Sequence, residues 1–443
     1  MIRTASTLLV ALALALIPVR PAAADVPFES WFVPDATLRI DYVHSGTDKT
    51  EEVSLEGLIR EGAWPGSRTQ LVDPTGYGAH RVVVYGATPS GEGGEGEVLY
   101  SRGFGSLFNE WQTTPEAKGG GRRAFTESAR VPFPKSPAQV VFETRDASGV
   151  FRVVQRFAVD PADPRIAPPR YAVGEFPVVK LQEIGPPQAS LDVLVLGDGY
   201  TKDELEKYHH DLDRFQRAFF ETGPFRLRQD RINLRALDVV SAETGPDEPA
   251  KGVWRKTALS TGFDTFGSPR YLTTTDGRAL RDIAGTAPYD VLIVLVNTSR
   301  YGGGGVFNLF AIFPSDNEYD EYVMIHEFGH SFAGLADEYY SSGVAYEEFY
   351  PKGVEPWEPN ITALLPDGKP KWAARVPPEV PCPTPPDAAQ FGKAVGCFEG
   401  AGYQATGLYR PVLDCMMFSK GEQPFCPVCA DAILRMIDLY AAP

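Results

Sequence analysis

The hydrophobic pattern of this 443-residue chain changes near residue 165, and this change limits the possible folds more than any other feature. Between residues 25 and 160, apolar and polar residues alternate in short runs, such as 38–42, 81–85 and 140–143, separated by Gly, Pro, Asp and Ser. Alternation of period two with frequent turns is typical of an antiparallel sandwich or barrel. We therefore expect residues 25–165 to form a β-sandwich-like accessory domain, with a binding module as the alternative.

The pattern after residue 188 is that of an α/β domain. Residues 166–188 are rich in proline and are expected to form a linker. Residues 191–196 then form an apolar run, and Thr201 with Glu204 forms a capping box before residues with helical spacing. Further strands are expected at 232–240, 291–296 and 306–313, and a short helix at 278–283. The fold class is thus α+β, with residues 189–443 as the larger domain.

The first 24 residues have the organisation of a signal peptide. Arg3 provides the positive charge, residues 8–17 are apolar, and three alanines at 22–24 precede Asp25. The apolar run is shorter than the roughly 20 residues that a membrane helix needs. We expect export to the periplasm or the medium, and no membrane span.

The charge of the chain argues against a nucleic-acid partner. Lys and Arg number 42 against 58 Asp and Glu, which leaves a formal net charge of −16. Neutralising phosphates requires a basic surface, and no long Lys/Arg cluster is present. Nucleic acids and anionic membranes are therefore not expected to bind.

The segment His326-Glu327-Phe328-Gly329-His330 has the HExxH pattern. Residues four apart in a helix share one face, about 6 Å apart along the axis, so both imidazoles reach one Zn²⁺. Glu327 is placed to act as general base, because zinc lowers the pKa of a bound water. The flanking residues are apolar, and a buried helix carries such polar side chains only where they have partners. The sequence predicts one catalytic zinc ion.

A catalytic zinc has three protein ligands and one open position, so a third donor is required. Gly334 follows the motif and can adopt the left-handed conformation that ends a helix and turns the chain back. Asp337, three residues later, is the expected third ligand. Glu338 is the alternative, and whichever carboxylate does not bind the metal is expected to contact a ligating histidine. The remaining histidines, including His209 and His210, are expected to be surface or packing residues.

Two further segments have competing interpretations. The glycines at 302–305 are not followed by Lys-Ser or Lys-Thr, so a flexible rim or edge strand beside the active cleft is favoured over a phosphate loop. The chain has five cysteines, for which we expect two disulfides and one free thiol, with Cys382–Cys397 as the first pair. The alternative is a zinc site that includes Cys426-Pro427-Val428-Cys429, although four-cysteine sites usually have two CxxC pairs. The cysteines are Cys382, Cys397, Cys415, Cys426 and Cys429.

The stretch HEFGHSFAGLADEY resembles the immunoglobulin-A-peptidase family of secreted bacterial zinc metallopeptidases. The exported precursor, the β-rich N-terminal region, the segment LDVLVLGDGYT and the C-terminal segments DCMM (414–417) and FCPVC (425–429) also match that family's organisation. The resemblance covers most of the chain after the signal peptide. Compared with the metzincin pattern HExxHxxGxxH, this chain has one extra residue before the glycine and Asp in place of the third His.

The resemblance implies a metzincin-like catalytic fold and a specific set of site residues. Met416 or Met417 would be the Met-turn residue beneath the metal, with ordinary core packing as the alternative. The glycine run and the resemblance together suggest that a substrate strand pairs with the edge at 302–307. The implied metal ligands are His326, His330 and Asp337, with Glu327 as general base.

We therefore expect a secreted zinc endopeptidase that acts on peptide or protein substrates. Candidates for stabilising the oxyanion are Tyr339, Tyr340, Tyr409 and Arg410. One alternative is an exported zinc hydrolase of non-protein amides such as peptidoglycan cross-links. The other is a binding or adhesion protein with a non-catalytic zinc site, which the intact Glu327 disfavours.

Overall fold

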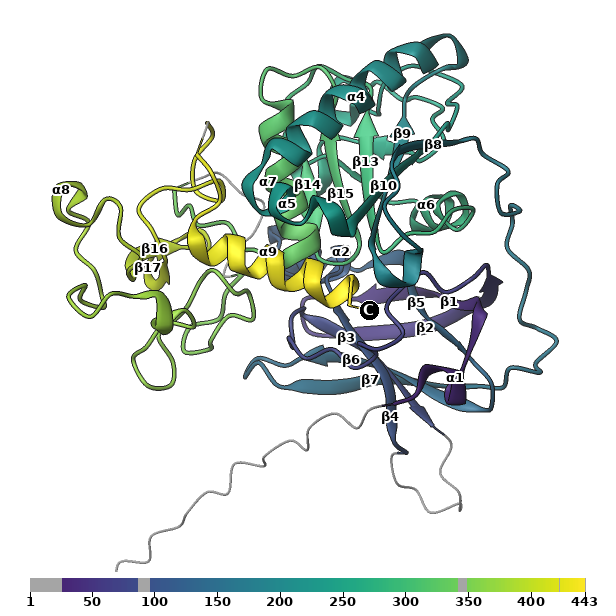
Figure 1. Ribbon diagram of the computed structural model, residues 1–443, viewed down its shortest axis with the longest axis horizontal. Helices are drawn as coiled ribbons and strands as arrows, with labels where there is room; N and C mark the ends of the chain where they lie inside the picture. The colour runs from purple at the N-terminus through teal and green to yellow at the C-terminus, as the bar shows by residue number, and fades with distance from the viewer. Residues whose placement is uncertain (1–25, 87–95, 342–348, 422, 443) are drawn as a thin grey trace, which may run out of the picture.

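The computed structural model describes residues 26–86, 96–341, 349–421 and 423–442 (Figure 1). The predicted signal peptide, residues 1–24, lies outside the described residues. Within the described ranges, no helix is both long and apolar enough to cross a membrane. In Figure 1 the N-terminal sheets lie below a larger sheet flanked by helices, and a C-terminal hairpin projects to the left.

The N-terminal part consists of two antiparallel sheets that face each other. The sheet orders are β2-β1-β5 and β4-β3-β6-β7. Alternate residues of both sheets, such as Ile40, Val84 and Val140, are buried in one shared core. The alternating pattern of the sequence thus produces the expected sandwich, because each strand turns one face inward. The elements are α1 (Phe28–Trp31), β1 (Phe32–Gly46), β2 (Glu51–Glu61), β3 (His80–Gly86), β4 (Val98–Phe104), α2 (Leu107–Gln112), α3 (Pro115–Lys118), β5 (Arg123–Pro134), β6 (Ala138–Arg145) and β7 (Phe151–Val159).

The second part is built around a six-stranded sheet of order β14-β15-β13-β9-β10-β8. The four central strands are parallel, and both edge strands are antiparallel to their neighbours. The central strands are buried on both faces, which explains their continuous apolar sequences. The strands are β8 (Val178–Gln182), β9 (Leu191–Asp198), β10 (Ile232–Leu237), β13 (Val291–Val296), β14 (Gly304–Val306) and β15 (Phe310–Pro314).

Helices cover both faces of this sheet. Val193 and Ile293 face a core shared with α4 (Leu205–Glu221), α7 (Asp320–Ala333) and α9 (Pro427–Tyr440). Leu194 and Val294 face the opposite core, which contains α6 (Gly277–Ala284) and α2 of the sandwich. The capping box of Thr201 and Glu204 is present as expected. Other elements are α5 (Gly223–Leu227), β11 (Thr261–Gly262), β12 (Thr273–Thr274), α8 (Ala388–Phe391), β16 (Phe398–Ala401) and β17 (Gln404–Arg410). The 3-10 helices are η1 (Pro187–Ala189), η2 (Lys202–Glu204), η3 (Gln229–Arg231), η4 (Pro249–Lys251), η5 (Thr265–Gly267) and η6 (Ala373–Arg375).

Three features differ from the expectations. Residues 306–313 form a hairpin rather than one strand, because Asn308 has φ +53° and the chain reverses between β14 and β15. The range 166–188, expected to be linker, contains strand β8. Of the two expected disulfides, one is formed, Cys382–Cys397, and the other three cysteines are unpaired thiols buried together around a carboxylate.

The sandwich is joined to the second part by buried polar contacts. Arg39 of β1 donates to Asp282 of α6 at 2.6 Å, and the guanidinium also contacts Glu61 at 3.0 Å. The Gly105 N–H donates to the Phe307 carbonyl oxygen at 2.7 Å. Because the Gly105–Phe307 bond lies just after β14, α2 and its preceding turn are held beside that strand.

Candidate active site

Helix α7 carries the HExxH motif and is fixed at both ends. Near its start, Arg214 of α4 forms two bonds of 2.8 Å to the Asp320 carboxylate, a bidentate pair. At its end, Gly334 has φ +62°, and its N–H donates to the His330 carbonyl oxygen at 3.1 Å. A Cβ at Gly334 would lie 2.6 Å from the Trp357 ring. The glycine therefore ends the helix and turns the chain back, as expected.

The glycine run forms the strand that packs against this helix. A Cβ on Gly305 would lie 2.4 Å from the Glu327 carbonyl oxygen and 2.8 Å from the His330 Cβ. A Cβ on Gly303 would lie 2.8 Å from a Glu327 carboxylate oxygen. The glycines thus let β14 approach α7 more closely than any other residue type allows. The run is an edge strand beside the cleft, as expected, and the close approach accounts for its composition.

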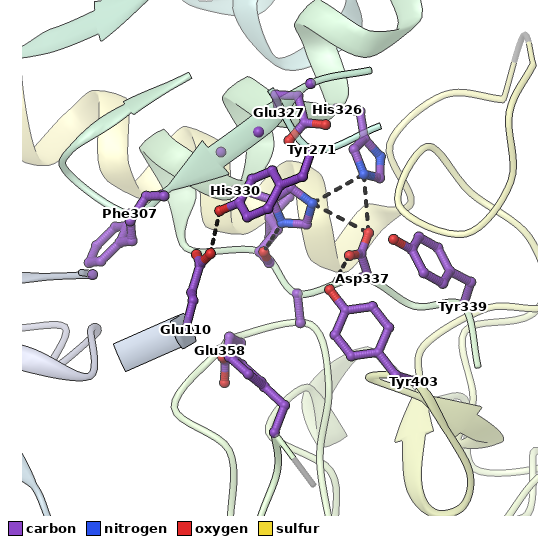
Figure 2. A pocket seen from close by; sticks show the side chains of 18 of the residues that line it. Glu110, Tyr271, Phe307, His326, Glu327, His330, Asp337, Tyr339, Glu358 and Tyr403 are labelled. Atoms are coloured by element: carbon purple, nitrogen blue, oxygen red, sulfur yellow. Dashed lines mark hydrogen bonds and ion pairs between the residues drawn. The ribbon is translucent and has the colours of Figure 1, made fainter. Parts of the chain in front are cut away.

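Three side-chain atoms converge on one point in front of α7 (Figure 2). The Nε2 atoms of His326 and His330 lie 3.1 Å apart. One Asp337 carboxylate oxygen, Oδ1, lies 3.1 Å from His326 Nε2 and 3.3 Å from His330 Nε2. Tetrahedral zinc with bonds of 2.0–2.2 Å would hold such atoms about 3.4 Å apart. The spacing therefore fits three ligands of a single zinc ion.

The outer nitrogen of each histidine faces a backbone carbonyl. His326 Nδ1 lies 3.0 Å from the Met416 carbonyl oxygen, and His330 Nδ1 lies 2.6 Å from the Leu335 carbonyl oxygen. A carbonyl only accepts, so each Nδ1 carries a proton, and a ring in its neutral form directs the Nε2 lone pair inward. Asp337 Oδ1 is buried and accepts no hydrogen bond from the described residues. Three electron-rich atoms facing one another require a cation between them.

The electrostatics of the site agree with this geometry. Burial disfavours a charged Asp337, but the nearby His330 and His326 outweigh it and hold the pKa of that carboxyl well below its usual range. Burial also opposes charge on His330, and Asp337 overcomes it to raise the pKa of His330 to about 9. Without a metal, a proton on His330 Nε2 therefore takes the place of the cation beside Asp337. Burial raises the pKa of Glu327, partly offset by the two histidines. A raised pKa suits a group that accepts a proton and then returns it near neutral pH.

Glu338, the alternative ligand, points away from the histidines. Its carboxylate lies 3.2 Å from the Sγ atoms of both Cys415 and Cys429. Its backbone N–H donates to the Met417 carbonyl oxygen at 2.8 Å. Burial and the neighbouring Cys426 raise the pKa of Glu338 to about 8. Glu338 therefore contacts neither His326 nor His330, and it belongs to a separate group of donors.

The two methionines lie beneath the motif helix. Met416 provides the carbonyl that accepts from His326 Nδ1. The Met417 side chain is fully buried, and its Sδ would lie 3.2 Å from a Cβ on Gly329. The backbone of this pair thus orients a histidine, while the Met417 thioether packs against the helix.

A cleft of about 400 Å³ opens in front of the three converging atoms, which is large enough for a few residues of a peptide. Among the expected oxyanion candidates, Tyr339 lines this cleft, whereas Tyr340, Tyr409 and Arg410 do not. Arg410 instead donates to the Gly400 carbonyl oxygen at 2.6 Å. Sequence reasoning missed lining residues far from the motif, such as Arg270, Tyr271 and Tyr403. Tyr403 donates to Asp337 Oδ2, and nothing in the local sequence marks it.

The sandwich also contributes to the cleft wall, which the sequence did not indicate. Ser106, Asn109 and Glu110 line the cleft, and the Tyr271 hydroxyl donates to Glu110. Figure 2 shows Glu110 and Tyr271 facing each other, joined by this bond. The N-terminal part is therefore more than a separate accessory unit, because it shapes the site.

The strand edge at 302–307 is partly occupied. The Gly303 N–H donates to the Arg270 carbonyl oxygen at 3.1 Å, and the Leu272 N–H donates to the Gly303 carbonyl oxygen at 3.2 Å. The Phe307 carbonyl oxygen accepts from Gly105. These backbone groups of Gly303 and Phe307 are already bonded within the chain. The expected pairing of a substrate strand is therefore wrong at these two residues.

A further cluster of His and Glu side chains lies in the sandwich. His44 contacts Glu127 through Nδ1 at 3.0 Å and Glu51 through Nε2 at 2.8 Å, and His80 lies beside it. Both histidines are buried, unlike His209, which is exposed and lies 2.8 Å from Asp238. The ring nitrogens of His44 already face carboxylates, so this cluster is a buried ion-pair network.

The helix with two histidines, the carboxylate after a glycine turn and the adjoining cleft are typical of a metal-dependent hydrolase. The model of the family described as IgA Peptidase M64 matches residues 179–394 and 386–437. The model described as Peptidase M64 N-terminus matches residues 27–156. The chain belongs to the IgA peptidase M64 family and is a peptidase, a hydrolase of peptide bonds. Comparison with curated proteins finds no match.

Proposed function

We propose that this peptidase is a zinc-dependent endopeptidase with His326, His330 and Asp337 as the ligands of its catalytic ion. The supporting observation is the convergence of three donor atoms within 3.1–3.3 Å of one another. Both histidine rings are oriented by backbone carbonyls, so the inner nitrogens are available to a metal. Nitrogen and carboxylate donors in this number are those that catalytic zinc uses.

Glu327 is the proposed general base. When bound, the ion acts as a Lewis acid that polarises the scissile carbonyl and lowers the pKa of water. Glu327 lines the cleft together with the three proposed ligands, and a Cβ on Gly303 would lie 2.8 Å from its carboxylate. Glu327 accepts a proton from the attacking water and passes it to the leaving amine. Tyr339 lines the same cleft and is the proposed contact for the substrate carbonyl, because the Tyr403 hydroxyl is already bonded to Asp337.

Several features support a metzincin-like catalytic domain. Helix α7 ends at a left-handed glycine, and the chain returns to place Asp337 opposite the histidines. The Met416–Met417 segment passes beneath the ligands and bonds to His326 through a carbonyl. An antiparallel edge strand borders the cleft. These features support a site in which the proposed metal would lie between a helix and a returning loop, the arrangement expected of a metzincin-like domain.

The substitution Glu327→Gln tests the base. It keeps the shape of the side chain, and we expect peptide hydrolysis to fall by at least 10²–10⁴-fold while the zinc content stays the same. Glu321→Gln, an exposed position on the same helix, is the matched control and is expected to retain full activity. Retained hydrolysis in Glu327→Gln would overturn the assignment.

Cleavage of an unbiased peptide library defines the substrate class. We expect internal peptide bonds to be cut, and the products to reveal the side-chain preference. Hydrolysis of peptidoglycan cross-links without cleavage of any library peptide would instead support a hydrolase of non-protein amides. Zinc binding with no turnover of either substrate would support a binding protein.

We also propose that the chain is exported. The charged, apolar and small-residue regions of residues 1–24 support this proposal. Expression of the full chain in a bacterial host should yield a protein beginning at Asp25, as measured by intact mass. Recovery of the unprocessed chain from the cytoplasm would contradict it, and fractionation distinguishes periplasm from medium.

A further inference from the structure

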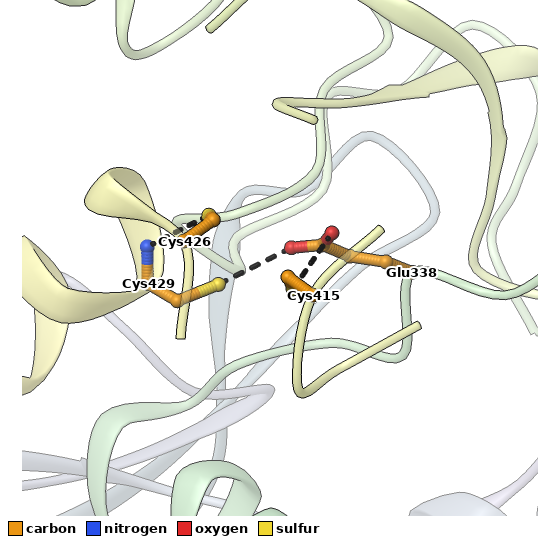
Figure 3. A group of neighbouring side chains, drawn as sticks. All are labelled: Glu338, Cys415, Cys426 and Cys429. Atoms are coloured by element: carbon orange, nitrogen blue, oxygen red, sulfur yellow. Dashed lines mark hydrogen bonds between the residues drawn. The ribbon is translucent and has the colours of Figure 1, made fainter. Parts of the chain in front are cut away.

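A second group of metal-binding side chains lies behind the catalytic ligands (Figure 3). It consists of one carboxylate and three thiols, and one donor atom of each lies within 4.8 Å of all the others. All four residues are buried, and none is more than 5% exposed. The members are Glu338, Cys415, Cys426 and Cys429.

The four donors come from three separate segments of the chain. Glu338 directly follows the catalytic ligand Asp337, Cys415 precedes the methionine pair, and the CxxC motif begins helix α9. Figure 3 shows Cys415 and Cys429 joined to the Glu338 carboxylate, and Cys426 joined to the Cys429 backbone nitrogen. Cys415 Sγ lies 3.2 Å from one of its oxygens, and Cys429 Sγ lies 3.2 Å from the other.

Backbone donors are directed at the sulfur atoms. The Met417 N–H donates to Cys415 Sγ at 3.3 Å, and the Cys429 N–H donates to Cys426 Sγ at 3.4 Å. Cys426 is the N-cap residue of the 14-residue helix α9, where the helix dipole favours a negative charge. The N–H donor and the start of the helix favour a thiolate at Cys426, and the thiolate is the form of cysteine that binds metals.

A buried arginine provides a balancing charge. Arg410 is 4% exposed and interacts electrostatically with Glu338 and Cys415. Its Nε atom has no hydrogen-bond partner within the described residues. Three thiolates and a carboxylate around a divalent ion carry a net charge of about −2, and the Arg410 guanidinium offsets part of it.

We propose that Glu338, Cys415, Cys426 and Cys429 bind a second zinc ion with a structural role. Tetrahedral zinc with bonds of about 2.3 Å to sulfur separates its sulfur ligands by roughly 3.8 Å, and the four donor atoms lie within 4.8 Å of one another. Four protein ligands leave no open position, so this ion would not be catalytic. Its ligands also account for the three cysteines that form no disulfide.

A disulfide between two of these cysteines explains the surroundings less well. Each thiol beside Glu338 donates to a different carboxylate oxygen, and Asn360 donates to Oε1 at 3.1 Å. Oxidation of Cys415 would remove the thiol donor of Oε2 and leave a buried oxygen without a partner. A disulfide between Cys426 and Cys429 would not explain why Cys415 and Glu338 are buried beside them.

The proposed ion connects the two sides of the catalytic centre. Glu338 belongs to the loop that carries Asp337, and its N–H bonds to the Met417 carbonyl oxygen. Cys415 belongs to the turn whose Met416 carbonyl orients His326. The structural zinc would therefore fix the position of the Asp337 loop relative to the Met416–Met417 turn. It would also attach both segments to the start of α9.

Metal analysis of full-length variants tests the proposal without relying on activity. His326→Ala/His330→Ala removes the catalytic ligands, and we expect this double variant to retain about one zinc per chain, half of the unmodified content. Cobalt substitution of the same variant should show the near-ultraviolet thiolate-to-cobalt absorption. A double variant that binds neither zinc nor cobalt would overturn the proposal.

Cysteine variants and thiol counting complete the test. Cys426→Ser/Cys429→Ser is expected to lose the thiolate-to-cobalt band, whereas Cys382→Ser/Cys397→Ser, which removes the disulfide, should keep it. If the first variant does not fold, thiol titration of the unmodified protein in denaturant with a chelator decides the question. We expect the three thiols of Cys415, Cys426 and Cys429 to react; a single reactive thiol would show a second disulfide and contradict the site. These outcomes are independent of whether Glu327 is the catalytic base.

Discussion

The Tyr403 hydroxyl donates a hydrogen bond to Asp337 Oδ2, the carboxylate oxygen that faces away from His326 and His330. Tyr403 lies in the turn between β16 and β17, 66 residues beyond Asp337. The Gly402 N–H also donates to the Asp337 backbone carbonyl oxygen at 2.9 Å. The C-terminal hairpin thus holds both the side chain and the backbone of the proposed third ligand.

Removing this hydroxyl should weaken metal binding. Tyr403→Phe leaves Asp337 Oδ2 without its donor, and partners of this kind typically contribute 10–100-fold to metal affinity. We expect loss of zinc from the catalytic ligands at a correspondingly lower chelator concentration. Tyr409→Phe, in the same hairpin but outside the cleft, is the control. Equal retention of zinc by both variants would show that the hairpin does not support the ligand.

The close contact between β14 and α7 predicts that a methyl group added at Gly305 reduces both stability and hydrolysis. In Gly305→Ala the new Cβ would lie 2.4 Å from the Glu327 backbone oxygen, so the strand and helix must separate. We expect a loss of about 1–3 kcal/mol in the free energy of unfolding and a strong loss of hydrolysis. Gly223→Ala, where a Cβ meets no atom within 4 Å, should change neither. Chemical denaturation and a peptide assay compare the two variants.

The sequence predicted features that depend on local spacing. The motif helix, the left-handed Gly334 and the strand at 291–296 follow from periodicity and from residue types at fixed positions. The same reasoning favoured Asp337 over Glu338, because the turn geometry sets which carboxylate returns to the histidines. These predictions need few contacts between distant parts of the chain.

Features that depend on long-range contacts were not predictable from the sequence. Glu110 and Tyr271 meet across 161 positions, and no local pattern marks either as part of the cleft. The single CxxC motif was interpreted against the usual four-cysteine pattern, but the side chains beside it are Cys415, which belongs to no CxxC pair, and Glu338, a carboxylate far away in sequence. The chain reversal at Asn308 depends on a left-handed backbone conformation, which the apolar sequence of residues 306–313 does not indicate.

Two substitutions of Met417, which lies beneath the motif helix, distinguish a packing role of its side chain from a chemical role of its sulfur. Met417 is fully buried against Gly329, so Met417→Ala would leave a cavity and should reduce the free energy of unfolding by about 2–5 kcal/mol. Met417→Leu keeps the volume and should cost less than about 1.5 kcal/mol. If the thioether only packs, the leucine variant should also retain hydrolysis. A leucine variant of normal stability without activity would show that the sulfur itself matters.

The buried network around His44 predicts how stability varies with pH. Burial opposes charge on His44, but hydrogen bonds to Glu127 and Glu51 outweigh it and raise the pKa of His44 to about 9. Burial and the nearby His44 charge lower the pKa of His80 to about 4. Burial opposes ionisation of Glu51 and Glu127, but the bonds from His44 lower the pKa of both.

The sign of each contribution follows from these shifts. Protonated His44 stabilises the folded state fully below pH 6.5, its ordinary pKa, and this contribution is lost as the pH rises through about 9. The neutral His80 favours folding above pH 6.5, and its contribution is lost as the pH falls towards 4. The two carboxylates contribute above their ordinary pKa of 4.5 and lose their contribution in acid. The network should therefore be most stabilising near pH 6.5.

Urea unfolding between pH 6.5 and 9 measures how the free energy of unfolding falls as His44 loses its proton. The unmodified protein should lose on the order of 1 kcal/mol per pH unit from this source, because folding retains one proton that the unfolded chain releases. In His44→Gln that proton is absent, so the slope should flatten, while the exposed His209→Gln should follow the unmodified protein. Equal slopes in the His44 variant and the unmodified protein would mean that His44 is neutral in the folded state. The carboxylates of Glu51 and Glu127 would then lack their cation, and hydrogen bonds would have to stabilise them, from Thr144 to Glu51 and from Ser106 and Tyr42 to Glu127.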